Sequence, residues 1–528
     1  MCGTPTPLSA RTPRKSARPT RNIFWAGSSG RWAWRKAVPS RTKAQAPVQI
    51  RMTNDERMTK PEYPSLPSEA QGDSQAFNRR DFLKGGSVAT LMAMMGGVPL
   101  ASCSAQTNPP ASGEIKLPPP EAKVGVIGLG TRGREIVNAL VPMEAHVAAI
   151  CDTYPAALSR CAREVPKATQ TKECQSILDD KEIKAVIVAT PTHQHKEIVL
   201  AALKAGKHVY CEAPLAHTIE DARAIAQAAK AARQQIFQAG LQNRADPERI
   251  FLVPFIRSGA LGQMAVVRAQ WHKKQSWRFP SPNADREKAI NWRLDKGVSL
   301  GLIGEIGCHQ IDEVNWFLNA RPVAVTGFGS ITLWNKSNKD GPDNREVPDT
   351  VQATFEYPDG MPLIYDATLA NSFELDYQIY YGSYSAVMLR DNKAWLFQEV
   401  DSPQQGWEIY ARKDQFYGTK GIALEAGASK SVQVKKPVEE PPFTHTTLAF
   451  ALEAFLRNVD DLEAGLAPVR DMIKDDPEAL TTALSTVKKR AAAGYHEGFQ
   501  ATALAIKANE AVMAGKRVEL KPELYELS

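Results

Sequence analysis

The sequence predicts an α/β protein with two folded domains: a doubly wound parallel sheet, and an α+β domain with an open, mostly antiparallel sheet. Three observations carry this prediction. A glycine-rich turn near residue 128 joins an apolar strand to a helix, and strands and helices then alternate up to residue 241. From residue 263, strand-rich segments separated by turn residues follow one another without crossover helices.

Charge is unevenly distributed along the 528 residues. Residues 1–60 contain 13 Lys and Arg against two acidic residues, whereas the remaining 468 contain 52 basic and 56 acidic side chains. The net charge of +7 therefore comes from the leader, and the folded part does not indicate a nucleic-acid partner. The hydrophobic content of 43% is ordinary for a globular protein of two or three domains.

Residues 1–103 are predicted to be a disordered leader with an export signal. The paired arginines of N-R-R-D-F-L-K (78–84) precede a glycine-rich apolar stretch of 16 residues (85–100), which resembles a twin-arginine signal. The stretch is too short and too weakly apolar for a membrane span, and an amphipathic surface helix is the alternative. We therefore expect recognition by the twin-arginine export machinery and a location in the periplasm or cell envelope.

The leader ends in L-A-S-C (100–103), which resembles the lipobox of bacterial lipoproteins. This makes Cys103 a candidate lipidation site and the only expected link to a membrane, although an ordinary cleavage site is the alternative. The Pro-rich segment 104–121 reads as an extended linker. The five cysteines that follow are irregularly spaced and do not predict a disulfide framework.

The first folded domain is predicted over 122–241. Gly128, Gly130 and Gly133 lie between a strand and a helix, and a second apolar strand ends in Asp152, 19 residues after Gly133. This is the dinucleotide fingerprint in its confirming context, with Thr131 and Arg132 in the same turn. A carboxylate at 152 favours NAD over NADP because it repels a 2′-phosphate. Arg132 weakens that preference, so NADP stays open.

Further cofactor contacts are expected where the next strands end, because ligands of such sheets bind at the carboxyl ends of the strands. Strands are predicted at 184–190 and 207–212, and helices at 195–205 and 221–232. The candidate residues at the strand ends are Thr190, Pro191, His195, Glu212 and Pro214. His193 and His195 do not by themselves indicate a metal, because further ligands are lacking.

The second domain is predicted over 242–528, with C-terminal helices. Within a helical run at 301–318, the i, i+4 and i+7 spacing of Glu305, His309 and Asp312 predicts one shared face. A histidine between two carboxylates can serve as a general base near neutral pH. A solvated helix face and a carboxylate–histidine–carboxylate metal site are the alternatives.

Several motifs together resemble the Gfo/Idh/MocA oxidoreductases over about 122–520. Besides the fingerprint they are A-T-P-T-H-Q-H, C-E-A-P-L, G-L-Q-N-R, I-N-W-R-L and G-E-I-G-C-H-Q-I-D-E-V-N-W-F-L. The resemblance implies a Rossmann domain, NAD, a sugar or polyol substrate and a substrate sheet that often forms a subunit interface, hence a homo-oligomer. It places His309 at the catalytic histidine and Glu305 where aspartate is usual. It also implies substrate-binding roles for Arg244, Trp292 and Arg293.

Ala213 departs from the family pattern Glu-Lys-Pro, whose lysine assists proton removal from the sugar hydroxyl. His309 would then act alone, or with Lys273 or Lys274 from the strand W-H-K-K-Q-S-W. The main expectation is an exported NAD-dependent oxidoreductase of sugars, polyols or glycosides that keeps and recycles its cofactor. The alternatives are a hydrolase or lyase resembling glycoside hydrolase family 109, and a non-catalytic sugar-binding protein.

Overall fold

A computed structural model describes residues 118–281, 283–334, 344–390, 393–402, 412–416, 419–424, 446–470 and 476–527. The expectations for the export signal, Cys103 and almost all of the linker concern residues outside these ranges. Within them, none of the helices combines the length and apolarity needed to cross a membrane. The five cysteines expected to be unpaired are free thiols, and they are Cys151, Cys161, Cys174, Cys211 and Cys308.

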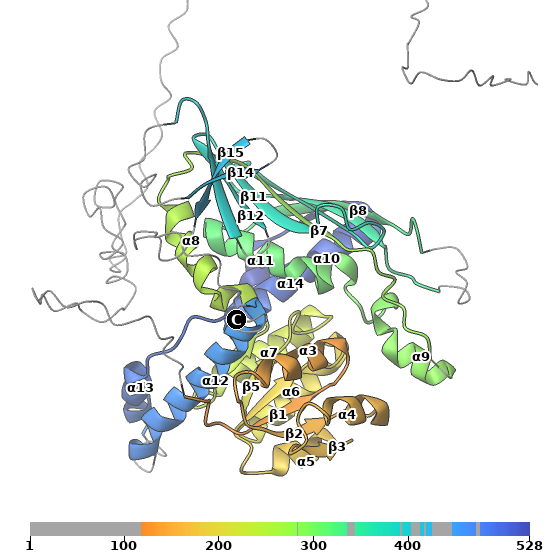
Figure 1. The fold of residues 1–528 in the computed structure, drawn as a ribbon, viewed down its shortest axis with the longest axis vertical. Coiled ribbons are helices and arrows are strands. Elements are labelled where there is room, and N and C mark those ends of the chain that lie inside the picture. Colours follow the sequence, from red (N-terminus) through yellow and green to blue (C-terminus); the bar gives the residue numbers. More distant parts are fainter. Residues whose placement is uncertain are drawn as a thin grey trace, which may run out of the picture. The chain divides into compact units, whose positions relative to one another are not determined.

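The first sheet has six parallel strands in the order β3-β2-β1-β4-β5-β6 (Figure 1). The strands are β1 (Val124–Ile127), β2 (Val147–Cys151), β3 (Thr169–Thr171), β4 (Ala185–Val188), β5 (His208–Cys211) and β6 (Phe237–Ala239). The helices between them are α3 (Thr131–Leu140), α4 (Pro155–Cys161), α5 (Cys174–Asp179), α6 (His195–Lys204) and α7 (Ile219–Ala231). This confirms the predicted doubly wound sheet.

The central strands are apolar because helices cover both faces of the sheet. Every residue of β1, β4 and β5 is buried, as expected for parallel strands between two helical layers. The strand order reverses direction between β1 and β4, and the loops at this point receive ligands in such sheets. The fold therefore places the glycine turn after β1 and the loop after β4 side by side.

Two C-terminal helices also cover this first sheet, although the sequence assigned everything after residue 241 to the second domain. Helix α12 (Thr447–Leu466) packs beside α3, and its Phe455 ring lies 5.8 Å from that of Tyr210 on β5. The start of α14 (Tyr495–Ala514) packs with α7 on the opposite face. Apolar side chains along α12, including Leu452 and Val459, are fully buried in this contact.

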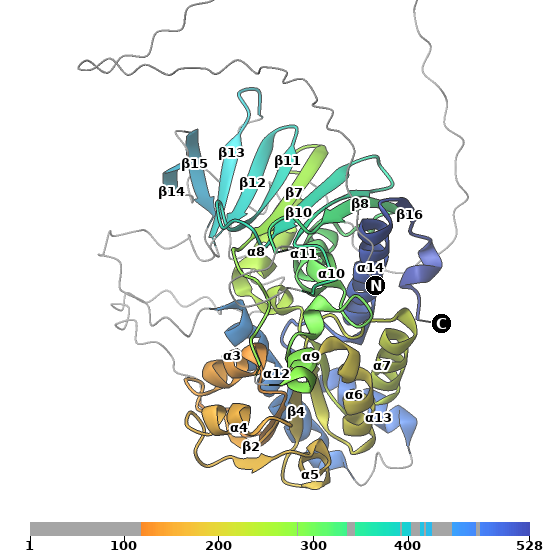
Figure 2. The ribbon, with the colours of Figure 1, turned by 90° about the vertical axis from the view of Figure 1, so that its right-hand side faces the viewer.

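The second sheet has ten strands in the order β14-β15-β13-β12-β11-β7-β10-β9-β8-β16 (Figure 2). Neighbouring strands are antiparallel except β7 and β10, which confirms an open, mostly antiparallel sheet. The strands are β7 (Met264–His272), β8 (Ala324–Ser330), β9 (Thr350–Glu356), β10 (Pro362–Thr368), β11 (Asp376–Gly382), β12 (Ser385–Arg390), β13 (Lys393–Gln398), β14 (Arg412–Phe416), β15 (Thr419–Leu424) and β16 (Arg517–Glu519).

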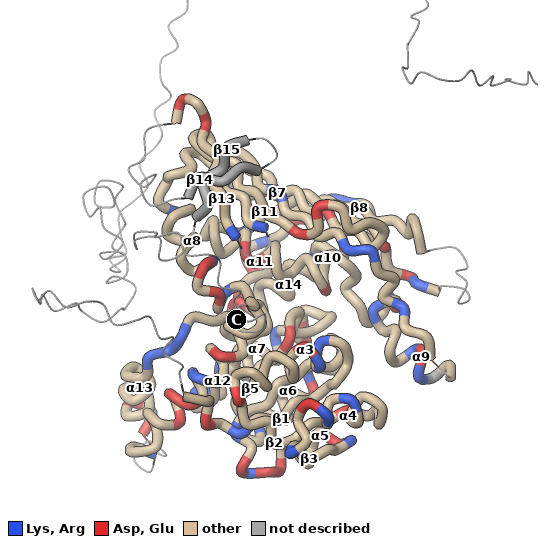
Figure 3. The backbone as a smooth tube through the Cα atoms, viewed as in Figure 1, with Lys and Arg blue, Asp and Glu red and all other residues tan. Residues whose placement is uncertain are grey.

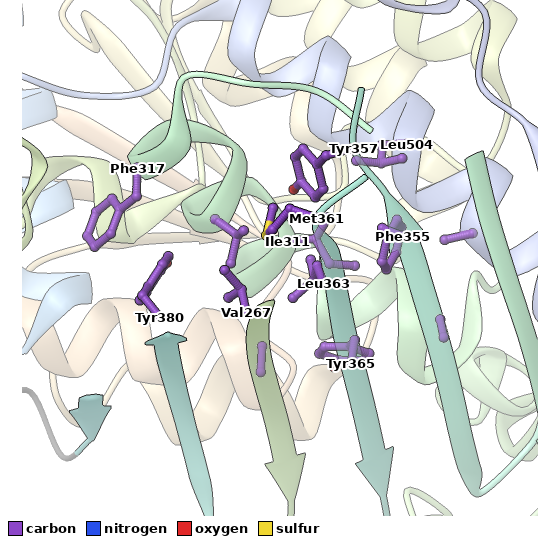
Figure 4. Close-up of a cluster of buried hydrophobic side chains, with 14 of the residues drawn as sticks. Val267, Ile311, Phe317, Phe355, Tyr357, Met361, Leu363, Tyr365, Tyr380 and Leu504 are labelled. Carbon is purple, nitrogen blue, oxygen red and sulfur yellow. The ribbon is translucent and has the colours of Figure 1, made fainter. Parts of the chain in front are cut away.

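Helices cover one face of this second sheet. They are α8 (Pro247–Arg257), α10 (Gly301–Glu305), α11 (Gly307–Leu318) and the end of α14. Figure 4 shows side chains from β7, β9 and β10, such as Val267, Phe355 and Leu363, gathered against Ile311 of α11. This packing fixes α10 and α11, which carry the predicted site residues, over the sheet. Acidic and basic residues are interspersed over both domains (Figure 3).

Candidate functional site

The glycine turn after β1 leaves no room for side chains at two of its three glycines. Gly128 has φ +91°, and a Cβ there would lie 2.7 Å from the backbone of Ala189. A Cβ on Gly133 would lie 1.9 Å from the Gly128 carbonyl oxygen. Gly130 precedes α3, and a Cβ there would meet nothing within 4 Å. The turn thus closes tightly on the sheet, while the open space beside Gly130, at the start of α3, leaves room for a pyrophosphate.

Asp152 follows β2 and holds the glycine turn in place. Its Oδ2 accepts a hydrogen bond from the Leu129 N–H at 2.8 Å, and its Oδ1 accepts one from the Tyr154 N–H at 2.7 Å. A carboxylate has further lone pairs after these two bonds. The position and chemistry of Asp152 fit the predicted contact with the adenosine ribose.

Arg132, in the first turn of α3, points toward the end of β5. Its Nε lies 3.0 Å from Glu212 Oε1, its Nη1 3.2 Å from Glu135 Oε2, and its Nη2 donates to Gln242 Oε1 at 2.8 Å. Burial works to lower the pKa of Arg132, but its neighbours, above all the Glu212 carboxylate, together raise that pKa. Burial raises the pKa of Glu212. These partners occupy Arg132, so its position does not favour NADP.

His195 is buried between two loops and does not face open space. One ring nitrogen lies 2.9 Å from the Thr190 carbonyl and the other 3.2 Å from the Pro214 carbonyl. Burial lowers the pKa of His195 to about 4. This residue therefore positions the loops after β4 and β5, including Pro191, and the prediction of a direct cofactor contact is corrected. The Thr190 hydroxyl is buried without a hydrogen-bond partner in the part of the chain that the structure describes, and it is the better candidate for such a contact.

Glu305, His309 and Asp312 do not share one helix face, because the predicted helix is two helices. Helix α10 ends at Glu305, Ile306 adopts φ −114° and ψ −51°, and α11 begins at Gly307. Glu305 turns back to accept bonds from the Leu300 N–H at 3.1 Å and the Thr192 hydroxyl at 2.9 Å. Burial raises the pKa of Glu305. Glu305 thus links α10 to the loop after β4.

Asp312 forms an ion pair with an arginine on the segment after β6, which packs against the core of the first domain. Arg244 Nε and Nη2 donate to Asp312 Oδ2 and Oδ1 at 2.8 and 2.9 Å, and the guanidinium lies 5.3 Å from the Trp316 ring centre. Arg244 belongs to η2 (Gln242–Ala245), which also reaches α11 through a 2.5 Å bond from Asn243 to Glu313. Arg244 and Asp312 thus form an ion pair where the two domains meet, and the substrate role of Arg244 and the catalytic role of Asp312 stay predictions.

His309 lies at the start of α11 without either predicted carboxylate partner. Burial and, secondarily, the positive charge of Arg132 lower the pKa of His309 to about 4. The Nδ1 atom is buried and has no hydrogen-bond partner among the described residues. The imidazole is therefore neutral at pH 7 and able to accept a proton, but it is a weaker base than expected.

Trp292 and Arg293 lie on the short helix η3 (Trp292–Leu294), in the electrostatic environment of the same site. Burial lowers the pKa of the Arg293 guanidinium. Smaller electrostatic effects on this pKa come from Glu305, Glu135, Glu212 and Arg132. By contrast, Lys273 lies exposed just beyond β7, and its recorded bond is from its backbone N–H to the Thr368 carbonyl. Lys274 is likewise exposed. No contact of either lysine with His309 is recorded among the described residues.

Two histidines that were not among the predicted site residues, His193 and His217, lie near Trp292. The His193 ring lies 6.1 Å from that of His217 and 6.0 Å from that of Trp292. Both histidine Nδ1 atoms are buried, and neither has a hydrogen-bond partner among the residues that the structure describes. His217 follows the C-E-A-P-L motif by two residues, and that proximity was the available signal. In the described part of the chain, no group of three His, Cys, Asp or Glu residues is arranged to hold a metal ion.

Comparison with known protein families agrees with this geometry. Residues 122–240 match the "Oxidoreductase family, NAD-binding Rossmann fold", and residues 254–383 match the "GFO/IDH/MocA C-terminal domain". The chain is thus similar in sequence to both domains of this family, and its first domain matches an NAD-binding Rossmann domain.

Relatives with assigned names include dehydrogenases and one glycosidase. The levoglucosan dehydrogenase of Pseudarthrobacter phenanthrenivorans is 31% identical over 37% of this chain, and the inositol 2-dehydrogenase of Paracoccus denitrificans is 30% identical over 37%. The α-N-acetylgalactosaminidase of Shewanella oneidensis is 27% identical over 41%. The matched parts cover 50%, 54% and 50% of these relatives, so the chain spans about half the length of the curated relatives it matches.

Solved structures share the fold. A levoglucosan dehydrogenase in complex with NADH and L-sorbose superposes with a TM-score of 0.57, covering 76% of this chain and 99% of that chain at 20% identity. An oxidoreductase domain protein from Kribbella flavida gives 0.55, with the same coverage and identity. These likenesses confirm the fold class.

Proposed function

We propose that the protein is an NAD-dependent oxidoreductase that acts on a sugar, polyol or glycoside. The observation that carries the proposal is the neutral imidazole of His309 near the dinucleotide turn. The positive charge of Arg132, a residue of that turn, contributes to lowering the pKa of His309. Names of relatives that refer to levoglucosan and inositol support this substrate class.

Different residues of the chain would bind the cofactor, transfer the proton and position the loops of the site. The turn of Gly128, Gly130 and Gly133, with Asp152 at the ribose, would hold NAD, which when bound accepts a hydride from a carbinol carbon. His309 takes the proton of the same hydroxyl group on its imidazole as the hydride departs. Glu305 acts indirectly, because it anchors α10 to Thr192 in the loop that borders the site.

A glycosidase or lyase is the second candidate, and Ala213 favours it. No amine is available at this position, and the Shewanella relative is named as an α-N-acetylgalactosaminidase. In such a reaction the proton to be removed lies beside a transient ketone, so a histidine without a lysine suffices.

Purified protein should be assayed on a panel of sugars, polyols and aryl glycosides with and without added NAD. Formation of NADH with free sugars supports the dehydrogenase, aryl release without net NADH supports the glycosidase, and neither result refutes both.

We also infer that the cofactor stays bound and is recycled. A segment of the second domain contacts the loop after β2: Arg286 of α9 (Ala284–Ile290) lies 3.5 Å from the ring centre of Tyr154, two residues after Asp152, which would bind the adenosine ribose. This contact would retard dissociation of NAD. Denatured protein should release stoichiometric nicotinamide nucleotide, and Arg286→Ala should accelerate its loss during dialysis. Nucleotide-free wild-type protein that requires soluble NAD would contradict the inference.

Export and lipid attachment remain a proposal that rests on the twin-arginine pattern and on Cys103. One acyl chain binds membranes weakly, whereas several anchor a protein stably. Cys103→Ser should therefore move the protein from the membrane fraction to the soluble periplasmic fraction. An unchanged distribution between the fractions would refute the anchor.

A homo-oligomer formed through the second sheet is supported by its uncovered face. Phe328 on β8 and Ile364 on β10 are 59% and 38% exposed, whereas Leu363 and Tyr365 point to the helices and are buried. Apolar side chains on an outer sheet face are suited to self-association. Sedimentation should show an oligomer that Ile364→Lys dissociates, and a monomeric wild type would refute it.

A further inference from the structure

The guanidinium of Arg293 lies between two indole rings. Its Cζ atom is 4.6 Å from the ring centre of Trp292 and 5.9 Å from that of Trp277. Trp277 has φ +61°, a left-handed conformation that is uncommon for a bulky aromatic residue and tends to occur at functional sites. Both rings lie within cation–π distance of the Arg293 guanidinium.

The three carboxylates whose charges raise the pKa of Arg293 all form bonds with other groups. Glu305 accepts bonds from the Thr192 hydroxyl and the Leu300 N–H, and Glu212 and Glu135 pair with Arg132. Arg293 itself has no recorded hydrogen bond or ion pair with any of the described residues. Its five N–H donors are therefore available to a ligand.

Other arginines with little exposure have partners. Arg244 pairs with Asp312, Arg249 with Glu313, and Arg278 with Glu287 at 2.6 Å. Burying a cation is costly unless an anion compensates it, which explains these pairs. Arg293 departs from this pattern, because it forms no ion pair with the described residues. Burial is the main cause that lowers its pKa.

We propose that Arg293 binds the carboxylate of an acidic sugar, so that the substrate is a hexuronic acid or its glycoside. This rests on the proposed function and narrows its substrate class. The planar guanidinium matches a carboxylate with two parallel hydrogen bonds, and the indoles offer flat apolar surfaces to the C–H groups of a sugar ring. A carboxylate fits better than a phosphate, because one cation balances one negative charge and Arg132 is already paired.

The anion is assigned to the substrate rather than to NAD. The pyrophosphate of a bound dinucleotide is served by the N–H groups at the start of α3. Arg293 comes instead from the second domain, on a segment that follows β7 and precedes α10. The assignment predicts that loss of Arg293 affects sugar binding and leaves NAD affinity intact.

The test compares paired ligands on the NAD-loaded full chain by calorimetry: glucuronate with glucose, galacturonate with galactose, and glucose 6-phosphate. Wild type should bind each uronate at least roughly tenfold more tightly than its neutral parent, which is the effect of a charge-assisted pair. Arg293→Gln should abolish that preference and change NAD affinity by less than about twofold, while Arg293→Lys should restore part of it. Arg278→Gln, which removes a paired arginine from the same segment, is the control and should keep the preference. Thermal unfolding of each variant verifies folding.

Three results would overturn the inference. Equal binding of uronates and neutral sugars shows that no carboxylate is recognised, and tighter binding of the sugar phosphate shows that the anion is a phosphate. A parallel loss of NAD affinity in Arg293→Gln makes Arg293 a cofactor-binding residue. If neutral sugars are oxidised without a preference for acids, only this inference fails, whereas a protein that turns over neither class with NAD refutes the proposed function itself.

Discussion

Arg244 and Asp312 join the two domains through a two-bond ion pair, with distances of 2.8 and 2.9 Å between their nitrogen and oxygen atoms. The Arg244 side chain is 17% exposed and that of Asp312 7%, so the pair lies largely out of water. Its neighbours in η2 extend the connection, because Gln242 accepts a bond from Arg132 and Asn243 donates one to Glu313. One turn of the chain thereby couples the cofactor turn to helix α11.

Breaking this pair from one side should destabilise the fold without a specific effect on substrate affinity. Asp312→Ala leaves the Arg244 cation buried without its partner, and such a change costs about 3 to 5 kcal/mol. Urea denaturation should show the loss as a lower midpoint, and the double variant Arg244→Met, Asp312→Leu should recover much of it. A raised KM at unchanged stability would instead return Arg244 to the substrate site.

The sequence predicted the cofactor turn well because its contacts are local. Gly128, Gly133 and Asp152 act through neighbours in one βαβ unit, where spacing along the chain determines geometry. The predicted triplet failed for the opposite reason: Asp312 pairs with Arg244, 68 residues away, and Glu305 with Thr192, 113 residues away. The break at Ile306 was equally hidden, because i, i+4 reasoning assumes one continuous helix.

Restoring the family's lysine at position 213 should not raise dehydrogenase activity. The side chain of Ala213 packs against a small apolar cluster formed by Leu300, Cys308, Ala505 and Ile506. Ala213→Lys would bring an ammonium group against these side chains, which costs stability unless the lysine is neutral. We expect a lower melting temperature and no gain in NADH formation. Ala213→Met, which has comparable bulk but no charge, is the control, and a large gain in activity with Lys alone would contradict this account.

The glycine turn can be tested with a matched pair of alanine variants. Gly133→Ala puts a Cβ 1.9 Å from the Gly128 carbonyl oxygen, so the turn must open. Gly130→Ala meets no protein atom within 4 Å, and its φ of −63° suits alanine. Gly133→Ala should therefore lose both thermal stability and NAD binding, whereas Gly130→Ala should keep the stability of the wild type. Equilibrium NAD titration together with melting curves separates these effects, and a stable Gly133→Ala variant would show that the turn is differently arranged.

His309 allows the most direct test of the chemistry, because its pKa is far from the ordinary value. Burial and Arg132 lower this pKa from 6.5 to about 4, so the folded protein keeps the imidazole neutral through most of the acidic range. A base must be neutral to accept a proton; kcat/KM should therefore stay flat from pH 7 to about 5 and fall as the pH passes through 4. Unfolded chains protonate this histidine already near pH 6.5. The free energy of unfolding must therefore fall as the pH decreases from 6.5 to about 4. Circular dichroism at each pH separates unfolding from titration.

Removing the charge of Arg132 should move the same inflection in a known direction. In Arg132→Gln the imidazolium form of His309 no longer faces a nearby cation, so its pKa and the acidic limb of kcat/KM should both rise. NMR titration of the His309 ring in the cofactor-free variant gives the same pKa without reliance on turnover. His309→Gln should abolish turnover and leave NAD bound, because the cofactor is held by the glycine turn. An inflection that persists in His309→Gln, in whatever activity remains, would assign the titrating base to another group, such as His193 or His217.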